Sequence, residues 1–155
     1  RRLIDREPIE VQGVRVGVTG DNIVRDCVFS NLVIHSENNG IAMQNPHRYY
    51  REGDATTLDL SNISLTNVTI DCPRFPLWIM AEDGVKLTRI EDLRFQDFRI
   101  RSGGSVVVRG CPETSIRDVR FANMHIDTTS EQALDCRHVE GLHMTNVTWN
   151  NRPGD

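Results

Sequence analysis

The chain has 155 residues, enough for one domain with a hydrophobic core but few for two. Its 18 Lys and Arg residues are scattered, 22 Asp and Glu residues outnumber them, and the formal net charge is -4. This distribution argues against a nucleic-acid surface and a membrane-binding surface, and no apolar run approaches the roughly 20 residues of a membrane span.

A nine-residue pattern, polar–apolar–x–apolar–x–Asn/Asp–apolar–x–apolar, recurs five times. In chain order the copies occupy residues 26–34, 62–70, 92–100, 118–126 and 141–149, the last opening on Gly141. Successive starts are 36, 30, 26 and 23 residues apart, so loops of decreasing length separate copies of a constant frame. A repeat of this period is typical of a solenoid.

Each nonamer predicts two short strands joined by a bend. Apolar residues two apart share one face of a strand, and this alternation breaks at the Asn or Asp before it resumes. Asn and Asp tolerate the left-handed backbone that a bend requires, and their stacked side chains can hydrogen-bond between copies. The expected buried columns are Leu65, Phe95, Phe121 and Met144 in one, and Ile70, Ile100 and Ile126 in the other.

A third strand is expected after each nonamer, because an apolar residue lies seven positions beyond its last residue. These positions are Ile41, Leu77, Val107 and Ala133. Three strands per copy predict an all-β fold, a right-handed parallel β-helix of about five to six coils, forming a single domain over residues 1–155. Two alternatives stay open: an antiparallel sandwich, and a helix over residues 130–142 that would overlap the fifth nonamer.

The cysteines do not indicate a metal site. Cys27, Cys72, Cys111 and Cys136 lack the C-x-x-C spacing of zinc ligands, and no metal or other cofactor is predicted. Cys27 and Cys136 fall at apolar positions of strand-like segments, where we expect small buried hydrophobic side chains.

The least regular stretch, residues 45–59, lies inside the longest spacing. Its His47, Arg48, Tyr49 and Tyr50 could stack on a sugar and hydrogen-bond to it, because loops on a rigid scaffold often carry function. An ordinary solvated loop is the other interpretation.

The nonamers, and especially residues 109–126, resemble glycoside hydrolase family 28, the polygalacturonase-like family of the pectin-lyase-like superfamily. C-terminal coils of that family often read Gly-x-Pro-Glu-x-Pro-Ile-x-Asn-Val-x-Phe-x-Asn-Val-x-Ile, and the resemblance covers about residues 11 to 149. It implies the C-terminal part of a longer, secreted or periplasmic glycosidase that degrades cell wall polysaccharides.

The resemblance fails at the family's active-site motifs. Its inverting carboxylates lie in Asn-Thr-Asp and Asp-Asp motifs, which the chain lacks. Residues 11–17 are similar to its Gly-His-Gly segment, but Gln12 replaces the histidine. Residues 40–44 are similar to its Gly-Ile-Arg-Ile-Lys stretch, but Ala42 and Gln44 replace the cations. Because charge-assisted bonds to a uronate carboxylate are lost, a neutral sugar is favoured.

Candidate site residues follow from these comparisons. Residues 76–83 are similar to the strand that ends in the family's active-site Tyr, with Glu82 or Asp83 in its place. These two are candidate catalytic acids, although adjacent strand residues point to opposite faces and a solvated turn competes. The candidate substrate-binding residues are Gln12, Arg15, Gln44, His47, Arg48, Tyr49 and Tyr50.

Three functions remain open from the sequence: a divergent polysaccharide hydrolase, a non-catalytic carbohydrate-binding β-helix, and a purely structural solenoid. The hydrolase would have its acids N-terminal to this chain, so we expect the 155 residues alone to be inactive. The expected partner is a polysaccharide or oligosaccharide. Self-association is also expected, through an open N-terminal coil with unpaired strand edges and uncovered apolar layers.

Overall fold

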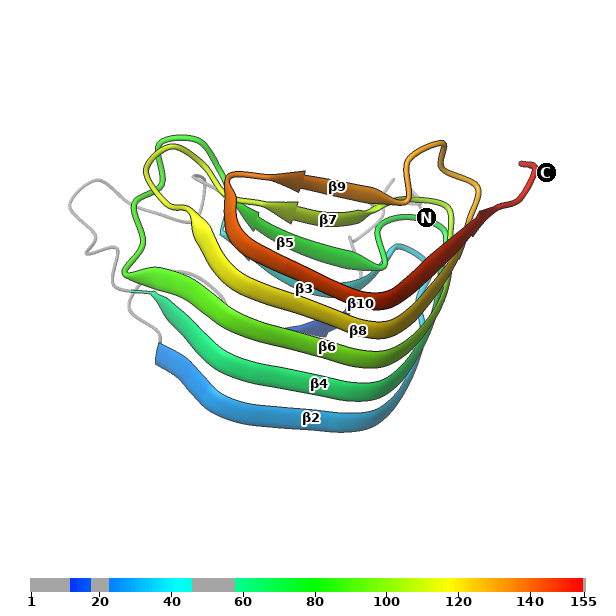
Figure 1. Ribbon diagram of the computed structural model, residues 1–155, viewed down its shortest axis with the longest axis horizontal. Coiled ribbons are helices and arrows are strands. Elements are labelled where there is room, and N and C mark those ends of the chain that lie inside the picture. The colour runs from blue at the N-terminus through cyan, green and yellow to red at the C-terminus, as the bar shows by residue number, and fades with distance from the viewer. Residues whose placement is uncertain (1–11, 18–22, 46–57, 155) are drawn as a thin grey trace, which may run out of the picture.

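A computed structural model describes residues 12–17, 23–45 and 58–154, apart from the side chains of Gln12 and Asn45. These residues form ten β-strands and no helix (Figure 1). The five long strands are β2 (Ile23–His35), β4 (Asp59–Cys72), β6 (Arg89–Ser102), β8 (Ile116–Thr128) and β10 (Val139–Asn151). The five short strands are β1 (Gln12–Arg15), β3 (Asn39–Asn45), β5 (Leu77–Ala81), β7 (Val106–Arg109) and β9 (Leu134–Arg137).

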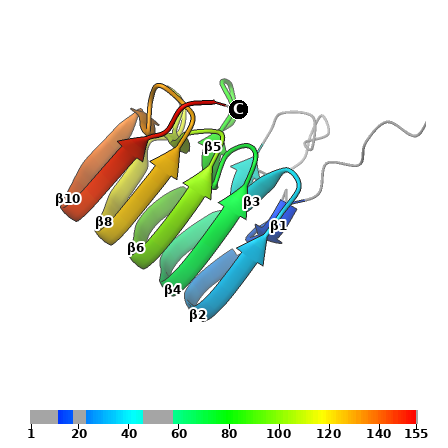
Figure 2. The ribbon, with the colours of Figure 1, turned by 90° about the vertical axis from the view of Figure 1, so that its right-hand side faces the viewer.

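The strands form two parallel sheets, one of long strands in the order β10-β8-β6-β4-β2 and one of short strands in the order β1-β3-β5-β7-β9. The chain alternates between the sheets, so each complete repeat consists of a long strand and the short strand that follows it, with β1 before the first of them and β10 after the last. Successive repeats lie beside one another with their arrows in one direction (Figure 2). The all-β, parallel prediction is therefore confirmed. The helix over residues 130–142 and the antiparallel sandwich are wrong, because residues 134–137 and 139–151 are strands in parallel pairs.

Each long strand bends twice, at residues with left-handed backbone. One bend falls at the sixth nonamer position, as predicted: Asn31, Asn67, Asp97, Asn123 and Asn146. The other falls at the first position, which the sequence indicated only as polar: Asp26, Asn62, Asp92, Asp118 and Gly141. The Asn and Asp residues of both sets have φ between 50 and 58°, a region that few other residues with a side chain adopt.

The core lies between the two sheets and is built from columns of equivalent side chains. Leu65, Phe95 and Phe121 stand in register and are fully buried, with the two phenyl centroids 5.5 Å apart. Ile70, Ile100 and Ile126 form the second predicted column. The predicted burial is confirmed for these six residues.

Met144 corrects the first column. It stands in register with Phe121, yet half of it (50%) is exposed. The reason is its place in β10, the last strand of the long-strand sheet, where no further strand among the described residues covers it. The sequence pattern identified the inward direction of this side chain correctly, but could not predict its burial.

The short-strand prediction was correct in the first two repeats and shifted by one residue in the next two. Ile41 and Leu77 pair and face the core, but Val106 and Leu134 follow them, in place of Val107 and Ala133. The corner lengths explain the shift, since they vary between repeats. Before β7 the corner is one residue shorter, and a Cβ added at Gly103 would lie 2.1 Å from the carbonyl oxygen of Pro73. Only glycine permits so close an approach.

The burial of the cysteines also differs from the expectation. All four are free thiols; Cys72 and Cys111 are buried, whereas Cys27 and Cys136 are only half-buried. Cys27 and Cys136 lie on β2 and β9, edge strands of their sheets at opposite ends of the stack, which leaves one side less covered. Burial raises the pKa of Cys72 to about 11, so this thiol stays protonated at neutral pH.

Candidate functional site

The short-strand sheet has an outer face, opposite the core, which carries several of the residues that the sequence singled out. Alternation along each strand places every second side chain there. One column on this face reads Arg15, Ala42, Trp78, Val107 and Asp135 from β1 to β9, and the next reads Gln44, Met80, Arg109 and Arg137 from β3 to β9. Residues more than 100 positions apart in sequence therefore share one surface, which we call the short-sheet face.

Two arginines hold one carboxylate at the β7–β9 end of this face. Arg109 Nη2 lies 2.5 Å from Asp135 Oδ2, and Arg137 Nε lies 3.2 Å from Asp135 Oδ1. Asp135 is mostly buried, with a side chain 15% exposed, while Arg137 is largely open to solvent. Because Nε of Arg109 is buried without a hydrogen-bond partner in the described structure, this cluster retains an unused donor.

An aromatic pair lies beside this polar cluster. Trp78 is half-buried in β5, between the small Ala42 and Val107 of the neighbouring strands. The ring of Phe75 lies 5.3 Å from that of Trp78, centroid to centroid, at an interplanar angle of 52°. The guanidinium of Arg74 lies 5.9 Å from the Phe75 centroid. Aromatic rings next to hydrogen-bonding groups give this surface both an apolar and a polar part.

The predicted substrate-binding residues are distributed unevenly in the structure. Arg15 is half-buried on the short-sheet face, whereas Gln44 is only 2% exposed, so its amide does not face solvent. Gln12 belongs to β1, but its side chain is outside the described residues, and so are His47, Arg48, Tyr49 and Tyr50. The sequence missed the main members of the face. Trp78 lies within the 76–83 segment that resembles the family, but it was not singled out there. Arg109 and Asp135 are 26 residues apart and meet only through the strand register.

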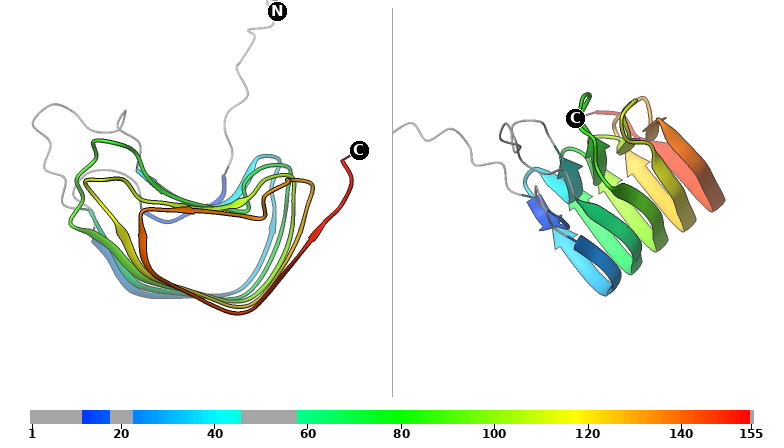
Figure 3. Two further views of the ribbon diagram at one scale, coloured as in Figure 1. Left: turned by 45° about the horizontal axis from the view of Figure 1, so that its top comes forward. Right: turned by 90° about the vertical axis from the view of Figure 1, so that its left-hand side faces the viewer.

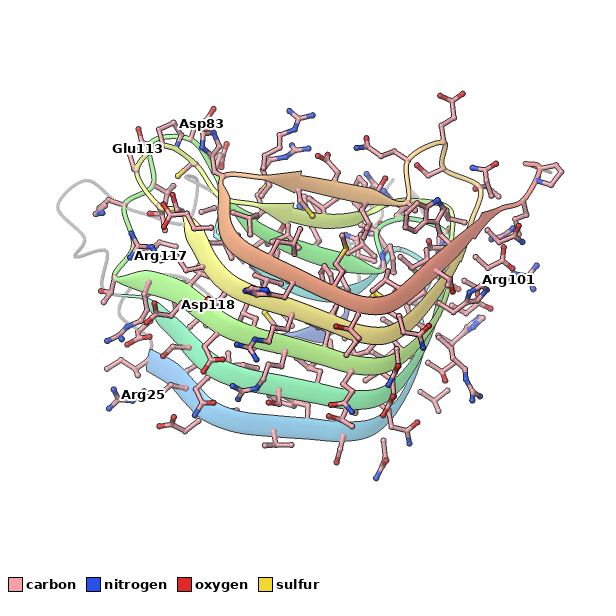
Figure 4. All side chains as sticks on the ribbon, viewed as in Figure 1. Arg25, Asp83, Arg101, Glu113, Arg117 and Asp118 are labelled. Atoms are coloured by element: carbon pink, nitrogen blue, oxygen red, sulfur yellow. The ribbon has the colours of Figure 1, made fainter. Side chains whose placement is uncertain are left out.

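Glu82 and Asp83 form part of an exposed turn just after β5. The N–H of Val85 donates to the carbonyl oxygen of Glu82 at 3.0 Å, and Gly84 supplies the left-handed residue of this turn, with φ 83°. Figure 4 shows Asp83 and Glu113 at the same corner of the molecule. The N–H of Gly84 donates to Glu113 and holds the pKa of that carboxyl below its usual range, the opposite of what a general acid needs.

A polar pocket of about 530 Å³ lies between the corner loops that precede β6 and β8. Its charged side chains already have partners. Arg89 pairs with Asp59 and Glu91 at 3.0 and 3.1 Å, and Lys86 donates to the carbonyl oxygen of Glu113 at 3.0 Å. Asp59 accepts a further bond from Ser61, so its role is structural. The residues that line the pocket include no aromatic side chain, so it lacks the stacking surface that Trp78 gives the short-sheet face.

No family model, curated protein or solved structure matches the chain. In the part of the chain that the structure describes, no three His, Cys, Asp or Glu side chains lie close enough to hold a metal ion. The same residues include no helix long and apolar enough to cross a membrane.

Proposed function

We propose that the chain is a right-handed parallel β-helix whose short-sheet face binds a polysaccharide or oligosaccharide. The helix interpretation is supported by the regular alternation between two parallel sheets and by the paired bends that divide each long strand. The right hand follows from the strong preference for right-handed connections between parallel strands of one sheet. The left-hand view of Figure 3 looks close to the stacking direction, where equivalent strands lie behind one another.

The observation that carries the sugar-binding proposal is the combination of Trp78 and Phe75 with the Arg109–Asp135–Arg137 cluster at the short-sheet face. Sugar rings have an apolar face that stacks on aromatic side chains and a rim of hydroxyls that both donate and accept. A carboxylate between two guanidinium groups supplies both kinds of partner. The resemblance to family 28 implies that two cations are lost, at Ala42 and Gln44, and for that reason we propose a neutral sugar.

The resemblance to glycoside hydrolase family 28 supports a wider role. We propose that the parent protein degrades cell wall polysaccharides, that it is secreted or periplasmic, and that its catalytic acids lie outside this chain. On the short-sheet face, Asp135 is already held by two arginines, and Glu82 and Asp83 share an exposed turn. Inverting hydrolysis needs two carboxyl groups about 6.5 to 9.5 Å apart across the scissile bond.

The binding proposal predicts that Trp78→Ala weakens sugar binding at least about tenfold, because stacking on the indole is worth about 1.4 kcal/mol. Calorimetric titration with neutral arabino-, galacto- and xylo-oligosaccharides measures the affinity. Trp149→Ala is the matched control, since the chain has two tryptophans and Trp149 lies on β10, in the other sheet. Equal losses in the two variants would exclude the short-sheet face, and no binding of any sugar would favour a structural solenoid.

The hydrolase proposal predicts that the 155-residue chain releases no reducing ends from polygalacturonate. Losing either member of an acid–base pair costs about 10²–10⁴-fold in rate. A chain that lacks both catalytic acids should therefore show no measurable hydrolysis. The assay compares the chain with its full-length parent protein. Turnover by the chain alone would place the catalytic acids within these residues, with Asp54, Asp59, Glu82 and Asp83 the first to substitute.

A further inference from the structure

Two equivalent sets of oxygen acceptors lie on the outer side of the long-strand sheet, one at each bend of β4 and β6. At the first bend they are the carboxylate of Asp92, the side-chain amide of Asn62 and the hydroxyl of Ser64. The guanidinium of Arg94 donates to all three, from Nε to Ser64 at 2.8 Å, from Nη1 to Asp92 at 2.6 Å and from Nη2 to Asn62. This bend therefore shows what such a set of acceptors holds.

The second bend repeats the set further along the same two strands, with the acceptors Asp97, Asn67 and Thr69. Asn67 Nδ2 donates to Asn31 on β2 at 2.8 Å, so the oxygen of this amide faces β6 and Asp97. Asp97 accepts from Asn123 on β8 through Oδ1 at 3.2 Å, which leaves its Oδ2 without a donor among the described residues. Two acceptors thus face each other where the first bend has a guanidinium between them.

A groove of about 350 Å³ lies at this second set of acceptors, and we call it the second-bend groove. It is lined by Asn67, Thr69, Asp97, Phe98, Arg99 and Asn123. Arg99 follows Asp97 by two residues, as Arg94 follows Asp92, and its side chain is exposed. It makes no hydrogen bond or ion pair within the part of the chain that the structure describes. The acceptors of the groove are therefore accessible to a donor from another molecule.

We propose that the second-bend groove binds the guanidinium group of an arginine side chain carried by another polypeptide. The three acceptors match the planar fork of N–H donors that arginine presents, and the charge of Asp97 favours a cation. An ammonium group is a compact point charge and lacks that fork. The groove belongs to the long-strand sheet, so the proposal stands apart from sugar binding on the short-sheet face.

NMR titration of the 155-residue chain with N-acetyl-arginine amide tests the proposal. We expect saturable shifts of the Asn67 side-chain amide and of the backbone amides of Thr69 and Arg99. N-acetyl-citrulline amide has the same shape without the charge, and N-acetyl-lysine amide has the charge without the fork. Both should bind at least about fivefold more weakly than the arginine probe. Equal binding of the three probes, or no shift of the groove amides by the arginine probe, would overturn the proposal.

Asp97→Asn should weaken binding of the arginine probe at least about tenfold, because it removes the charge and its new amide can donate to Asn67. Asp118→Asn is the matched control, with the same change of charge at the first bend of β8, and should bind the probe as the unsubstituted chain does. Circular dichroism checks that both variants fold. Unchanged binding by Asp97→Asn, or an equal loss in the two variants, would exclude the groove as the site.

Arg99 should limit the affinity of the groove. Its charge lies on the lining of the groove and repels a cation there, and its position relative to the acceptors lets it compete with the probe as Arg94 would at the first bend. Arg99→Ala should therefore bind N-acetyl-arginine amide several-fold more tightly in the same titration. Unchanged or weaker binding would contradict the proposal, because it would mean that the probe does not occupy the place which the internal equivalent of Arg94 can reach.

Discussion

At the scale of single residues, the bends depend on Asn and Asp in left-handed backbone, and the two residue types differ in one respect. An Asn side chain donates to one neighbour and accepts from another, whereas an ionised Asp only accepts. Asp97 accepts from Asn123 at 3.2 Å, and no hydrogen bond joins Asp97 to Asn67. At the first bend, Arg94 bridges the corresponding break, contacting both Asp92 and Asn62.

Asp97→Asn should therefore stabilise the chain by about 0.5–1 kcal/mol, the usual net contribution of one hydrogen bond, because the new amide can donate to Asn67. Asp92→Asn is the matched control at the other bend and should show no gain, since it removes the ion pair with Arg94. Urea unfolding of both variants measures the free energy of unfolding. An equal gain in the free energy of unfolding of the two variants would show that the stabilisation comes from the reduced negative charge and not from the new hydrogen bond.

At the scale of elements, much of the long-strand architecture could be predicted from the nonamer. Apolar spacing determined which residues face inward, and the Asn or Asp identified one bend. The first bend was missed because its polar residue looked like the boundary of the pattern, although Asp26 and Asn62 are of the same residue types as Asn31 and Asn67. The short strands were shifted because corner length depends on close backbone contacts such as that of Gly103, which no periodicity contains.

Truncating two side chains of the same core column should lower the free energy of unfolding by different amounts, depending on how deeply each is buried. Phe95→Ala should lower the free energy of unfolding by about 3–5 kcal/mol, because the ring is fully buried between Leu65 and Phe121. Met144→Ala, in the same column but half-exposed, should cost less than about 1 kcal/mol. Similar losses in urea unfolding would show that β10 is covered in solution.

At the scale of the whole molecule, the site is a product of stacking. Trp78, Arg109 and Asp135 come from three successive repeats, and none of their spacings is a motif. The sequence drew attention to Arg15 and Gln44 through a family resemblance, but burial removes the Gln44 amide from the surface. The side chains that remain on the short-sheet face can hydrogen-bond to hydroxyl groups, and the fixed register of the parallel strands holds them beside one another.

Mapping of a bound neutral oligosaccharide by amide and indole NMR shifts tests the binding proposal most directly. Titration should shift the indole N–H of Trp78 and the amides of β5, β7 and β9, while the indole of Trp149 and the amides along β4 and β6 stay in place. Shifts confined to the long-strand sheet or to the pocket beside Arg89 and Glu113 would contradict the assignment of the short-sheet face.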